Sequence, residues 1–321
     1  MNRRLLEAIK SHQTIGVFSH TRPDGDALGS QIALCIWLEA LGKNVYAFNP
    51  DPFPPNLEWM QSFFPVQVPD QQSVGECDAY LFLDGNKLDR FGEIASQLDQ
   101  TSRPRYLIDH HPDPEMHYDE GILRPGTSST AELVYDLIGT ESSVSISPEI
   151  AKALYTGIIT DTGSLRFDSV RPRTHRVVAD LLELGEFSPP LIHEAVYDNN
   201  ELRHLKLLGA ALKKIELFND NQLATMSVTQ AMLDEAGCTY ADLEGFVVYP
   251  LSLKETKAAF LLYEKDGRIK LSLRSKSSLD VNKLARNFEG GGHPKAAGGW
   301  HPGPIEQAVK EIIQEAEKQL G

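Results

Sequence analysis

Short apolar runs alternate with helix-like stretches through the first half of the chain, and this alternation limits the possible folds more than any other feature of the sequence. The runs are rich in β-branched and aromatic residues, and Gly, Pro, Asp or Asn stand at their ends. Strands that alternate with helices are typical of a parallel sheet covered by helices, so we predict an α/β domain. The predicted strands are 14–19, 44–48, 78–84 and 104–109.

The helices between these runs are predicted from apolar residues that recur three and four positions apart. Residues at this spacing precede Gly42, which predicts a helix over roughly 27–41. A Ser-Pro pair, typical of an N-cap and a first helical turn, begins a second predicted helix at roughly 147–160. A third helical pattern, 174–185, ends at a glycine.

The second half of the chain has a different pattern. The sequence FSPP at 187–190 cannot continue a helix, and we place the end of the first domain there. The predicted parts are a parallel-sheet α/β domain at 1–188, a helical connector at 189–215, and a smaller α+β domain at 216–321. In the last part, apolar and polar residues alternate as in half-buried antiparallel strands. Those strands are predicted at 224–228, 245–253, 258–264 and 268–275.

The chain is acidic, with 45 Asp and Glu residues against 31 Lys and Arg residues and a net charge of −14. A grip on long nucleic acid would require a local basic groove, so we do not expect long duplex DNA as a partner, whereas small anionic substrates are compatible. The three cysteines form no disulfide framework and no zinc cluster. With neither a signal peptide nor a long apolar segment, the sequence predicts a cytoplasmic protein without a membrane span, and a homo-oligomer is compatible with it.

Acidic and imidazole side chains stand where the predicted elements end. Ligands of open α/β sheets bind at the carboxyl ends of the strands, so we expect these side chains to converge. Close carboxylates raise one another's pKa, a conflict that divalent cations resolve. Imidazoles among carboxylates favour manganese, iron, cobalt or zinc over calcium, and two ions ~3.5–4 Å apart are usual for phosphoester cleavage. The residues are His20, Asp24, Asp26, Asp84, Asp109, His110, His111 and Asp161.

Each motif taken alone also has a structural explanation. Asp24 and Asp26 could cap the helix that follows them, and Asp161 could be an ordinary helix-end aspartate. The sequence GGGH at 290–293 could be a simple glycine turn. The joint placement of the acidic and imidazole residues at element ends favours a metal site.

Five motifs, in this order, carry a resemblance to a known family. HTRPDGDALGS, LDG, DHH and TGIITDTGS resemble the motifs of the DHH phosphoesterases, and GGGHPKAAGG at 290–299 resembles the signature of the DHH-associated domain. The resemblance covers nearly the whole chain. Compact two-domain members, the nanoRNases, hydrolyse very short RNA oligonucleotides and 3′-phosphoadenosine 5′-phosphate (pAp). The resemblance implies the same substrates here, without the additional domains of RecJ-type exonucleases.

Carried over residue by residue, the resemblance implies two divalent ions, with manganese expected. A water shared by the two ions would attack the phosphorus in line. His111 would lie beside the substrate phosphate as an acid or phosphate donor, and Asp109 would orient a liganding imidazole. The implied ligands are His20 and Asp24 for one ion, Asp26, His110 and Asp161 for the other, and Asp84 as the bridge between them.

The second domain is expected to bind substrate. Three consecutive glycines, Gly290, Gly291 and Gly292, would let backbone amides approach a phosphate as an anion-binding nest, and His293 would add a donor. Arg274 could act as a bidentate phosphate fork, which the resemblance supports. A cleft between the domains, closed by the smaller one, would select substrates by length.

Two other classes of function stay open. The same metal centre could act on linear or cyclic dinucleotides or on polyphosphate. Manganese pyrophosphatases share the metal motifs, but GGGHPKAAGG argues against their different second domain. A non-enzymatic nucleotide-binding module would be expected to lack a liganding carboxylate or imidazole, and this sequence lacks none of them.

Overall fold

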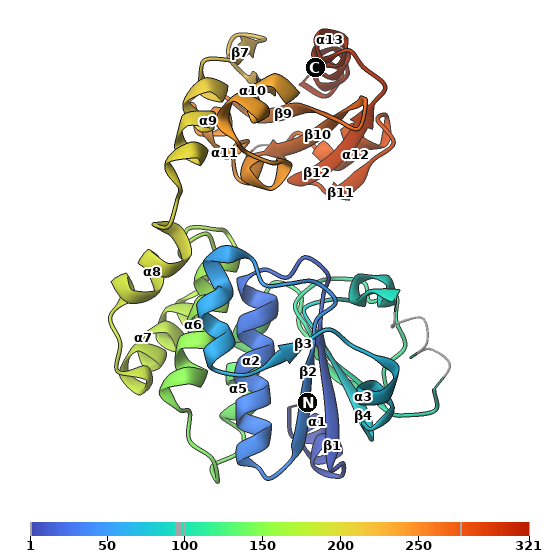
Figure 1. The fold of residues 1–321 in the computed structure, drawn as a ribbon, viewed down its shortest axis with the longest axis vertical. Coiled ribbons are helices and arrows are strands. Elements are labelled where there is room, and N and C mark those ends of the chain that lie inside the picture. The colour runs from blue at the N-terminus through green and yellow to red at the C-terminus, as the bar shows by residue number, and fades with distance from the viewer. Residues whose placement is uncertain (1, 94–97, 99–100, 277, 321) are drawn as a thin grey trace. The chain divides into compact units, whose positions relative to one another are not determined.

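The protein folds into two compact units that divide after Asn199, each with its own six-stranded sheet (Figure 1). The computed structural model describes residues 2–93, 98, 101–276 and 278–320. The segment 189–215, predicted as a connector, is shared between the units, with α8 (Pro189–Tyr197) in the first and α9 (Leu202–Leu212) in the second. Across the described ranges, we find no helix with the length and apolar content that a bilayer span requires.

The first sheet is entirely parallel, with the strand order β3-β2-β1-β4-β5-β6. Its four central strands match the four predicted ones, so the predicted α/β class is confirmed. The edge strands β3 and β6 were too short for the pattern to indicate. The strands are β1 Thr14–Ser19, β2 Asn44–Phe48, β3 Val66–Gln67, β4 Ala79–Leu83, β5 Arg105–Asp109 and β6 Glu120–Leu123.

Two apolar cores cover the faces of this sheet. The larger core packs α1, α2, α5, α6 and α7 against one face, and the smaller one is largely aromatic (Figure 1). The three predicted helices of this part correspond to α2, α6 and α7. The helices are α1 Asn2–Lys10, α2 Gly25–Ala40, α3 Gln71–Gly75, α5 Thr130–Ile138, α6 Pro148–Asp161 and α7 Pro172–Gly185, with 3-10 turns η1 Pro55–Ser62 and η2 Leu88–Phe91.

Helices α2 and α6 pack with their backbones in close approach. A Cβ atom on Gly29 would lie 2.3 Å from the carbonyl oxygen of Ala153, and one on Gly157 would lie 3.0 Å from a carboxylate oxygen of Asp26. Glycine at these two positions therefore permits the approach. As a result, the first turn of α2 and the last turn of α6 lie next to each other, at the end of the sheet where Asp26 meets Asp161.

The second unit has the strand order β11-β12-β10-β9-β8-β7. Its strand pairs are antiparallel except β8 with β9, which are parallel. The antiparallel prediction is wrong for that pair, because the helical segment between the two strands provides a crossover. The strands are β7 Ile215–Phe218, β8 Leu223–Val228, β9 Ala258–Lys265, β10 Arg268–Ser275, β11 Gly291–His293 and β12 Ala296–His301.

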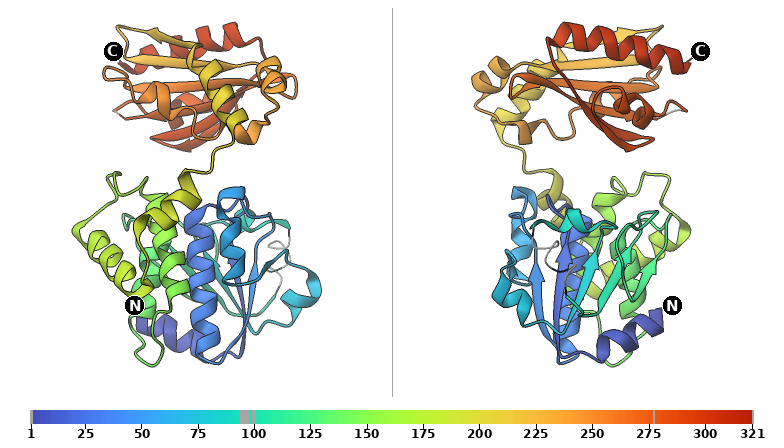
Figure 2. Two further views of the ribbon diagram at one scale, coloured as in Figure 1. Left: turned by 60° about the vertical axis from the view of Figure 1, so that its left-hand side comes forward. Right: turned by 90° about the vertical axis from the view of Figure 1, so that its right-hand side faces the viewer.

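Helices lie on both faces of the second sheet. One core joins it to α12 and α13, and the other joins it to α9, α10 and α11. Figure 2 shows α13 lying along the sheet. The additional helices are α10 Gln230–Ala236, α11 Val248–Leu251, α12 Val281–Arg286 and α13 Ile305–Leu320, with the 3-10 turn η3 Tyr240–Leu243.

The strand predicted at 245–253 is wrong, since this segment forms turns and the short helix α11. Phe246 and Val247 are buried, whereas Val248 and Tyr249 are exposed, so burial does not alternate residue by residue. Pro250 has no backbone N–H for a sheet ladder. An apolar run of this length cannot be assigned to strand or helix from its pattern alone.

The glycine run at 290–292 leads into an antiparallel hairpin, and its role as an anion-binding nest stays a prediction. Gly291 and Gly292 belong to β11, which pairs with β12 in an antiparallel hairpin. A Cβ atom on Gly290 would lie 2.0 Å from the carbonyl oxygen of Gly298, and one on Gly292 would lie 2.5 Å from that of Ala296. The glycines are therefore explained by the close approach of the neighbouring strand.

Candidate active site

Eight acidic and imidazole side chains lie together at one end of the first sheet. His20 follows β1, Asp84 follows β4, and the Asp109-His110-His111 sequence begins at the last residue of β5. The parallel strands thus carry their polar ends to one edge. Helix α2 begins at Asp24 and Asp26, and α6 ends at Asp161.

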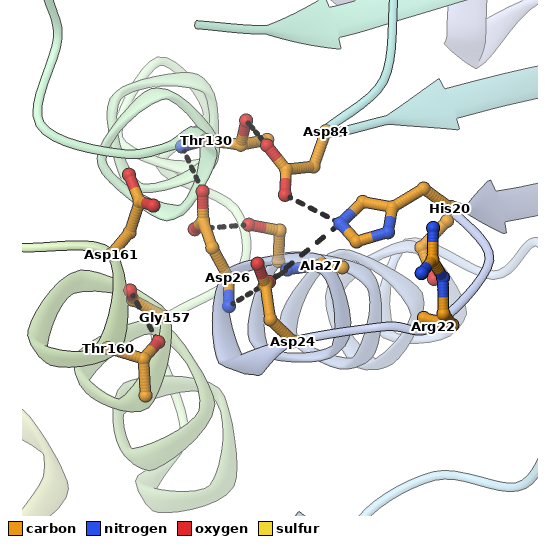
Figure 3. A network of polar contacts seen from close by, with 12 residues as sticks. His20, Arg22, Asp24, Asp26, Ala27, Asp84, Thr130, Gly157, Thr160 and Asp161 are labelled. Carbon is orange, nitrogen blue, oxygen red and sulfur yellow. Dashed lines mark hydrogen bonds and ion pairs between the residues drawn. The ribbon is translucent and has the colours of Figure 1, made fainter. Parts of the chain in front are cut away.

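The first group consists of His20, Asp24 and Asp84 (Figure 3). The Nε2 atom of His20 lies 3.4 Å from Oδ2 of Asp84 and 3.9 Å from Oδ1 of Asp24. Asp24 also caps α2, because its Oδ1 accepts hydrogen bonds from the backbone N–H groups of Asp26 and Ala27, both at 3.0 Å. The capping explanation for Asp24 is therefore correct, and the cap fixes the carboxylate beside His20.

The second group consists of Asp26, His110 and Asp161. The Nε2 atom of His110 lies 4.0 Å from Oδ2 of Asp26, 3.5 Å from Oδ2 of Asp161 and 3.6 Å from Oδ1 of Asp84. Asp84 therefore contacts the imidazoles of both groups. Asp84, His110 and His111 form a third group that could hold an ion, so the assignment of ligands to two ions stays a prediction.

The two ring nitrogens of His20 and His110 have different partners. Nδ1 of His20 lies 2.8 Å from the carbonyl oxygen of Thr21, and Nδ1 of His110 lies 3.2 Å from that of Thr127. A carbonyl accepts only from an N–H, so Nδ1 carries the proton in each neutral ring. The lone pair of Nε2 then points toward the carboxylates, which is the arrangement of histidines that bind metals.

The electrostatics of the site reflect carboxylates held close together. Burial and the neighbouring carboxylates Asp84 and Asp161 raise the pKa of Asp26 well above its usual range. Burial, together with the charges of Asp84 and Asp24, raises the pKa of Asp161 to about 6, against the opposing effect of His110. Although burial opposes it, contact with His20, His110 and His111 lowers the pKa of Asp84. Among these three carboxylates, Asp84 is the one whose pKa is lowered.

The geometry of these groups fits divalent ions. Two ligand atoms that each lie about 2.1 Å from one ion are roughly 3.0 Å apart at a right angle and roughly 4.2 Å apart in line. The imidazole–carboxylate distances of 3.4 to 4.0 Å fall within that range and exceed a normal N–H···O distance. A set of imidazole and carboxylate donors without thiolate suits manganese, iron, cobalt or zinc.

Asp109 and His111 form a pair beside these groups. Nδ1 of His111 lies 2.8 Å from Oδ1 of Asp109, which also accepts the backbone N–H of His111 at 3.1 Å. Burial acts to lower the pKa of His111, but the contacts with Asp109 and Asp84 outweigh it and raise that pKa. The fully buried Asp109 thus fixes the ring of His111 and favours its protonated form.

Thr130, which the sequence interpretation missed, donates to both groups (Figure 3). Its backbone N–H donates to Oδ2 of Asp26 at 2.7 Å, and its hydroxyl donates to Oδ1 of Asp84 at 3.0 Å. The adjacent residue, Ala131, donates its N–H to the other oxygen of Asp26 at 2.8 Å. Asp26 therefore lies at the N-terminus of α5, where the helix dipole stabilises a negative charge.

The backbone conformation of Asp84 is unusual. Its backbone has φ +56°, in the left-handed region that non-glycine residues seldom adopt, and its N–H donates to the carbonyl oxygen of Ile108 at 3.1 Å. Such a conformation costs on the order of 1 kcal/mol and is found most often at functional sites. It turns the carboxylate of Asp84 from the end of β4 toward both imidazoles.

The predicted substrate-binding residues lie on the second unit. Arg274 on β10 and His293 on β11 are both in register with Ala296 on β12, which separates them. Partners in register point to the same face of a sheet, so Arg274, Ala296 and His293 form one row. Burial lowers the pKa of Arg274, and the described residues offer its guanidinium one backbone carbonyl, that of Leu273 at 3.1 Å, and no ion pair.

Comparison with known proteins relates both units to described domains. The profile of the DHH family, N-terminal domain, matches residues 14–158, and that of the DHHA1 domain matches residues 221–321. The bifunctional oligoribonuclease and PAP phosphatase NrnA of Bacillus subtilis is 28% identical over 303 residues, which cover 93% of this chain and 92% of that protein.

Solved structures agree with this relationship. The crystal structure of an exopolyphosphatase-related protein from Bacteroides fragilis has a TM-score of 0.93 and 33% identity, and it covers 99% of this chain and 95% of that one. RecJ from Thermus thermophilus, solved in complex with Mn²⁺, has a TM-score of 0.57 and 15% identity over 99% of this chain and 53% of its own. The second likeness concerns the fold alone.

Proposed function

Because the chain belongs to the DHH family and is a phosphoesterase, we propose that it hydrolyses short RNA oligonucleotides and pAp with a two-metal centre in its first unit. The observation that carries this proposal is the pair of ligand groups that share Asp84. The B. subtilis relative, aligned over nearly its whole length, has a name that joins both activities. This relationship supports the assignment of substrates.

The proposed ion ligands are the two groups described above. His20 and Asp24 would hold one ion, and Asp26, His110 and Asp161 would hold the other, with Asp84 between them. When bound, two divalent ions would acidify a water toward neutral pH and neutralise charge on the phosphoryl oxygens. We propose manganese because imidazoles soften the donor set relative to an all-oxygen magnesium site.

His111 and Asp109 are proposed to act in proton transfer and in orienting the proton donor. Nδ1 of His111 lies 2.8 Å from Oδ1 of Asp109, and we propose that the imidazole held in this way contacts the substrate phosphate. Its raised pKa favours a protonated ring that can donate a proton to the leaving oxygen or a hydrogen bond to the phosphate. Asp109 holds that ring in place.

We further propose that the second unit binds a substrate phosphate through Arg274 and His293. Arg274 is half-buried and without an ion pair in the described part of the chain, an arrangement that an anionic ligand would stabilise. Ala296, which lies between them in register, has only a methyl side chain. Because Cys35, Cys77 and Cys238 are free thiols, we propose a cytoplasmic location.

A substrate panel tests the proposal. The purified protein would be assayed with Mn²⁺ and with Mg²⁺ on pAp, RNA of two to five nucleotides, RNA of about 24 nucleotides, short DNA, cyclic dinucleotides, pyrophosphate and polyphosphate. We expect the highest kcat/KM for the short RNAs and pAp, since the acidic chain offers little attraction to long phosphate backbones. Equal kcat/KM for the shortest and the longest RNA would indicate a processive exonuclease instead.

A further inference from the structure

The face of the second sheet that carries Arg274 and His293 continues along β10 and β12 as a basic and aromatic strip. Register assigns its members, because paired residues on neighbouring strands point to the same face and alternate residues along a strand share it. Along β10, the residues of the opposite face are buried and those of this face are partly exposed. The strip consists of Arg268, Lys270, Ser272 and Arg274 on β10, and of Ala296, Gly298 and Trp300 on β12.

Within the unit, the helices on this side cover other strands. The core under α9, α10 and α11 includes Ala224 and Met226 of β8 and Ala259 and Leu261 of β9. Among the described residues, it includes no side chain from β10, β11 or β12. Helix α11 approaches β10 on this side, but the described side chains of the strip do not belong to its core, in contrast to the opposite face, where α12 and α13 pack.

Trp300 is the centre of this strip. The Nζ atom of Lys270, its partner in register, lies 4.4 Å from the centroid of the indole, and the guanidinium of Arg268 lies 5.4 Å from it. Glu289 contacts Arg268 at 2.6 Å, so the positive charge at that end of the strip is partly neutralised. Gly298 has no side chain beside the ring. An aromatic ring flanked by cations is how sequence-tolerant proteins hold single-stranded nucleic acid.

The strip has the length of a short oligonucleotide. Ala296, in the row of Arg274 and His293, is four residues from Trp300 along β12, which is roughly 13 Å at ~3.3 Å per residue. In the stacked conformation that we propose for the RNA, nucleotides rise ~3.4 Å each, so about four of them separate the two positions. A dinucleotide or pAp held by a phosphate at the row is too short to reach Trp300, whereas a pentanucleotide can reach it.

We propose that Trp300 and Lys270 form a distal subsite, in which the indole stacks on a base and the ammonium group binds the adjacent phosphate of single-stranded RNA. The inference rests on the proposed function, because it takes short RNA as the substrate. Charge complementarity selects this ligand: the face positions of β10 and β12 include lysine and arginine and no carboxylate. The subsite adds affinity for RNA of about four or five nucleotides and none for shorter substrates.

Kinetics on substrates of different length test the subsite. Base stacking on an aromatic side chain is worth ~1–3 kcal/mol, so Trp300→Ala is expected to lower kcat/KM for a pentanucleotide roughly 5- to 150-fold. The same variant leaves kcat/KM for a dinucleotide and for pAp unchanged, and Trp300→Phe restores part of the loss. Lys270→Ala lowers kcat/KM for the pentanucleotide and weakens its dependence on salt. Lys318→Ala is the control, since Lys318 lies on α13, which packs against the opposite face of the sheet.

A binding measurement separates this inference from the proposed activity. Pentaadenylate would be titrated into protein kept in EDTA, with tryptophan fluorescence as the signal, so that no turnover is required. Quenching that is lost in Trp300→Phe supports the subsite even if the wild type hydrolyses no RNA, an outcome that would refute only the proposed function. Equal loss of kcat/KM on all substrates in Trp300→Ala, or no loss on the pentanucleotide in either Trp300 variant, would overturn the subsite.

Discussion

Replacing Thr130 by valine would test whether the N-terminus of α5 orients the two carboxylates of the metal site. Thr130 is fully buried, and its hydroxyl donates to Asp84 at 3.0 Å. Valine has nearly the same shape and keeps the backbone N–H that donates to Asp26 at 2.7 Å. The substitution therefore removes one hydrogen bond to a buried carboxylate and changes little else.

The expected loss follows from the charge of the acceptor. A hydrogen bond to a charged group contributes about 1.5–3 kcal/mol, and removal of a group that orients a metal ligand weakens metal binding about 10–100-fold. A free energy of 1.4 kcal/mol corresponds to about a tenfold change in affinity, so the hydrogen-bond energy and the expected loss of metal binding agree. A carboxylate that loses a hydrogen-bond donor also becomes a more basic ligand, which by itself would strengthen metal binding. We expect the loss of orientation to weaken metal binding more than this effect strengthens it, because the carboxylate of Asp84 must face the imidazoles of both His20 and His110.

Calorimetric titration of Mn²⁺ into chelator-treated protein would measure the effect. Thr130→Ser keeps the hydroxyl and should restore most of the affinity. Thr156→Val is the matched control, because Thr156 is equally buried but its hydroxyl donates only to the carbonyl oxygen of Lys152, at 2.8 Å. Melting curves in EDTA would show whether either variant unfolds. Wild-type affinity in Thr130→Val, or an equal loss in Thr156→Val, would refute the orienting role.

Further predictions address the centre and the second unit. Chelation should abolish hydrolysis of a short RNA and Mn²⁺ should restore it best, so full turnover by metal-free protein would contradict the two-metal proposal. Asp84→Asn should abolish turnover while the protein stays folded, as judged by activity, metal content and melting, and a normal rate with two ions bound would remove Asp84 from the site. The pKa of Asp161 is raised to about 6 in the metal-free fold, so the protonated carboxyl stabilises the fold. This contribution is present below pH ~4 and is lost as pH rises through about 6. Melting of EDTA-treated protein should show this loss of stability, and Asp161→Asn should reduce it. Protons compete with metal at the same carboxylate, so Mn²⁺ affinity should fall as pH falls below about 6. Arg274→Ala and His293→Ala should weaken binding of a short RNA roughly ten- to a hundredfold with unchanged metal content, and loss of manganese without a change in RNA affinity would refute their assignment to substrate.

The central strands and the main site could be predicted because their signals are local. The four inner strands of the first sheet are short apolar runs with polar ends, and burial on both faces requires such runs. Once the strands are parallel, their carboxyl ends meet, so His20, Asp84 and His110 converge by topology alone. The partition into two groups came from the family resemblance, since spacing along the chain does not reveal which carboxylate faces which imidazole.

Orienting residues were harder to predict because they act through backbone groups. The carbonyl oxygen of Thr127 and the N–H of Thr130 carry no residue-specific signal. A signal for the helix was nevertheless present. Ser129 is followed three residues later by Glu132, the pattern of a capping box, and the hydroxyl of Ser129 does accept the N–H of Glu132 at 3.2 Å. This pattern indicates the start of α5, which is where Asp26 finds its donors.

The charge of the metal site bears on the role of the basic side chains that we propose for substrate binding on the second unit. Five carboxylates belong to the centre, those of Asp24, Asp26, Asp84, Asp109 and Asp161. Two divalent ions would add four positive charges and a protonated His111 would add one, so the centre would be close to neutral before any substrate arrives. Electrostatic attraction for phosphate must therefore come from outside the centre, and Arg274 and Lys270 supply it on one strip of the second sheet. Because the chain as a whole carries a net charge of −14, we expect it to disfavour long phosphate backbones, which agrees with the proposed preference for short RNA.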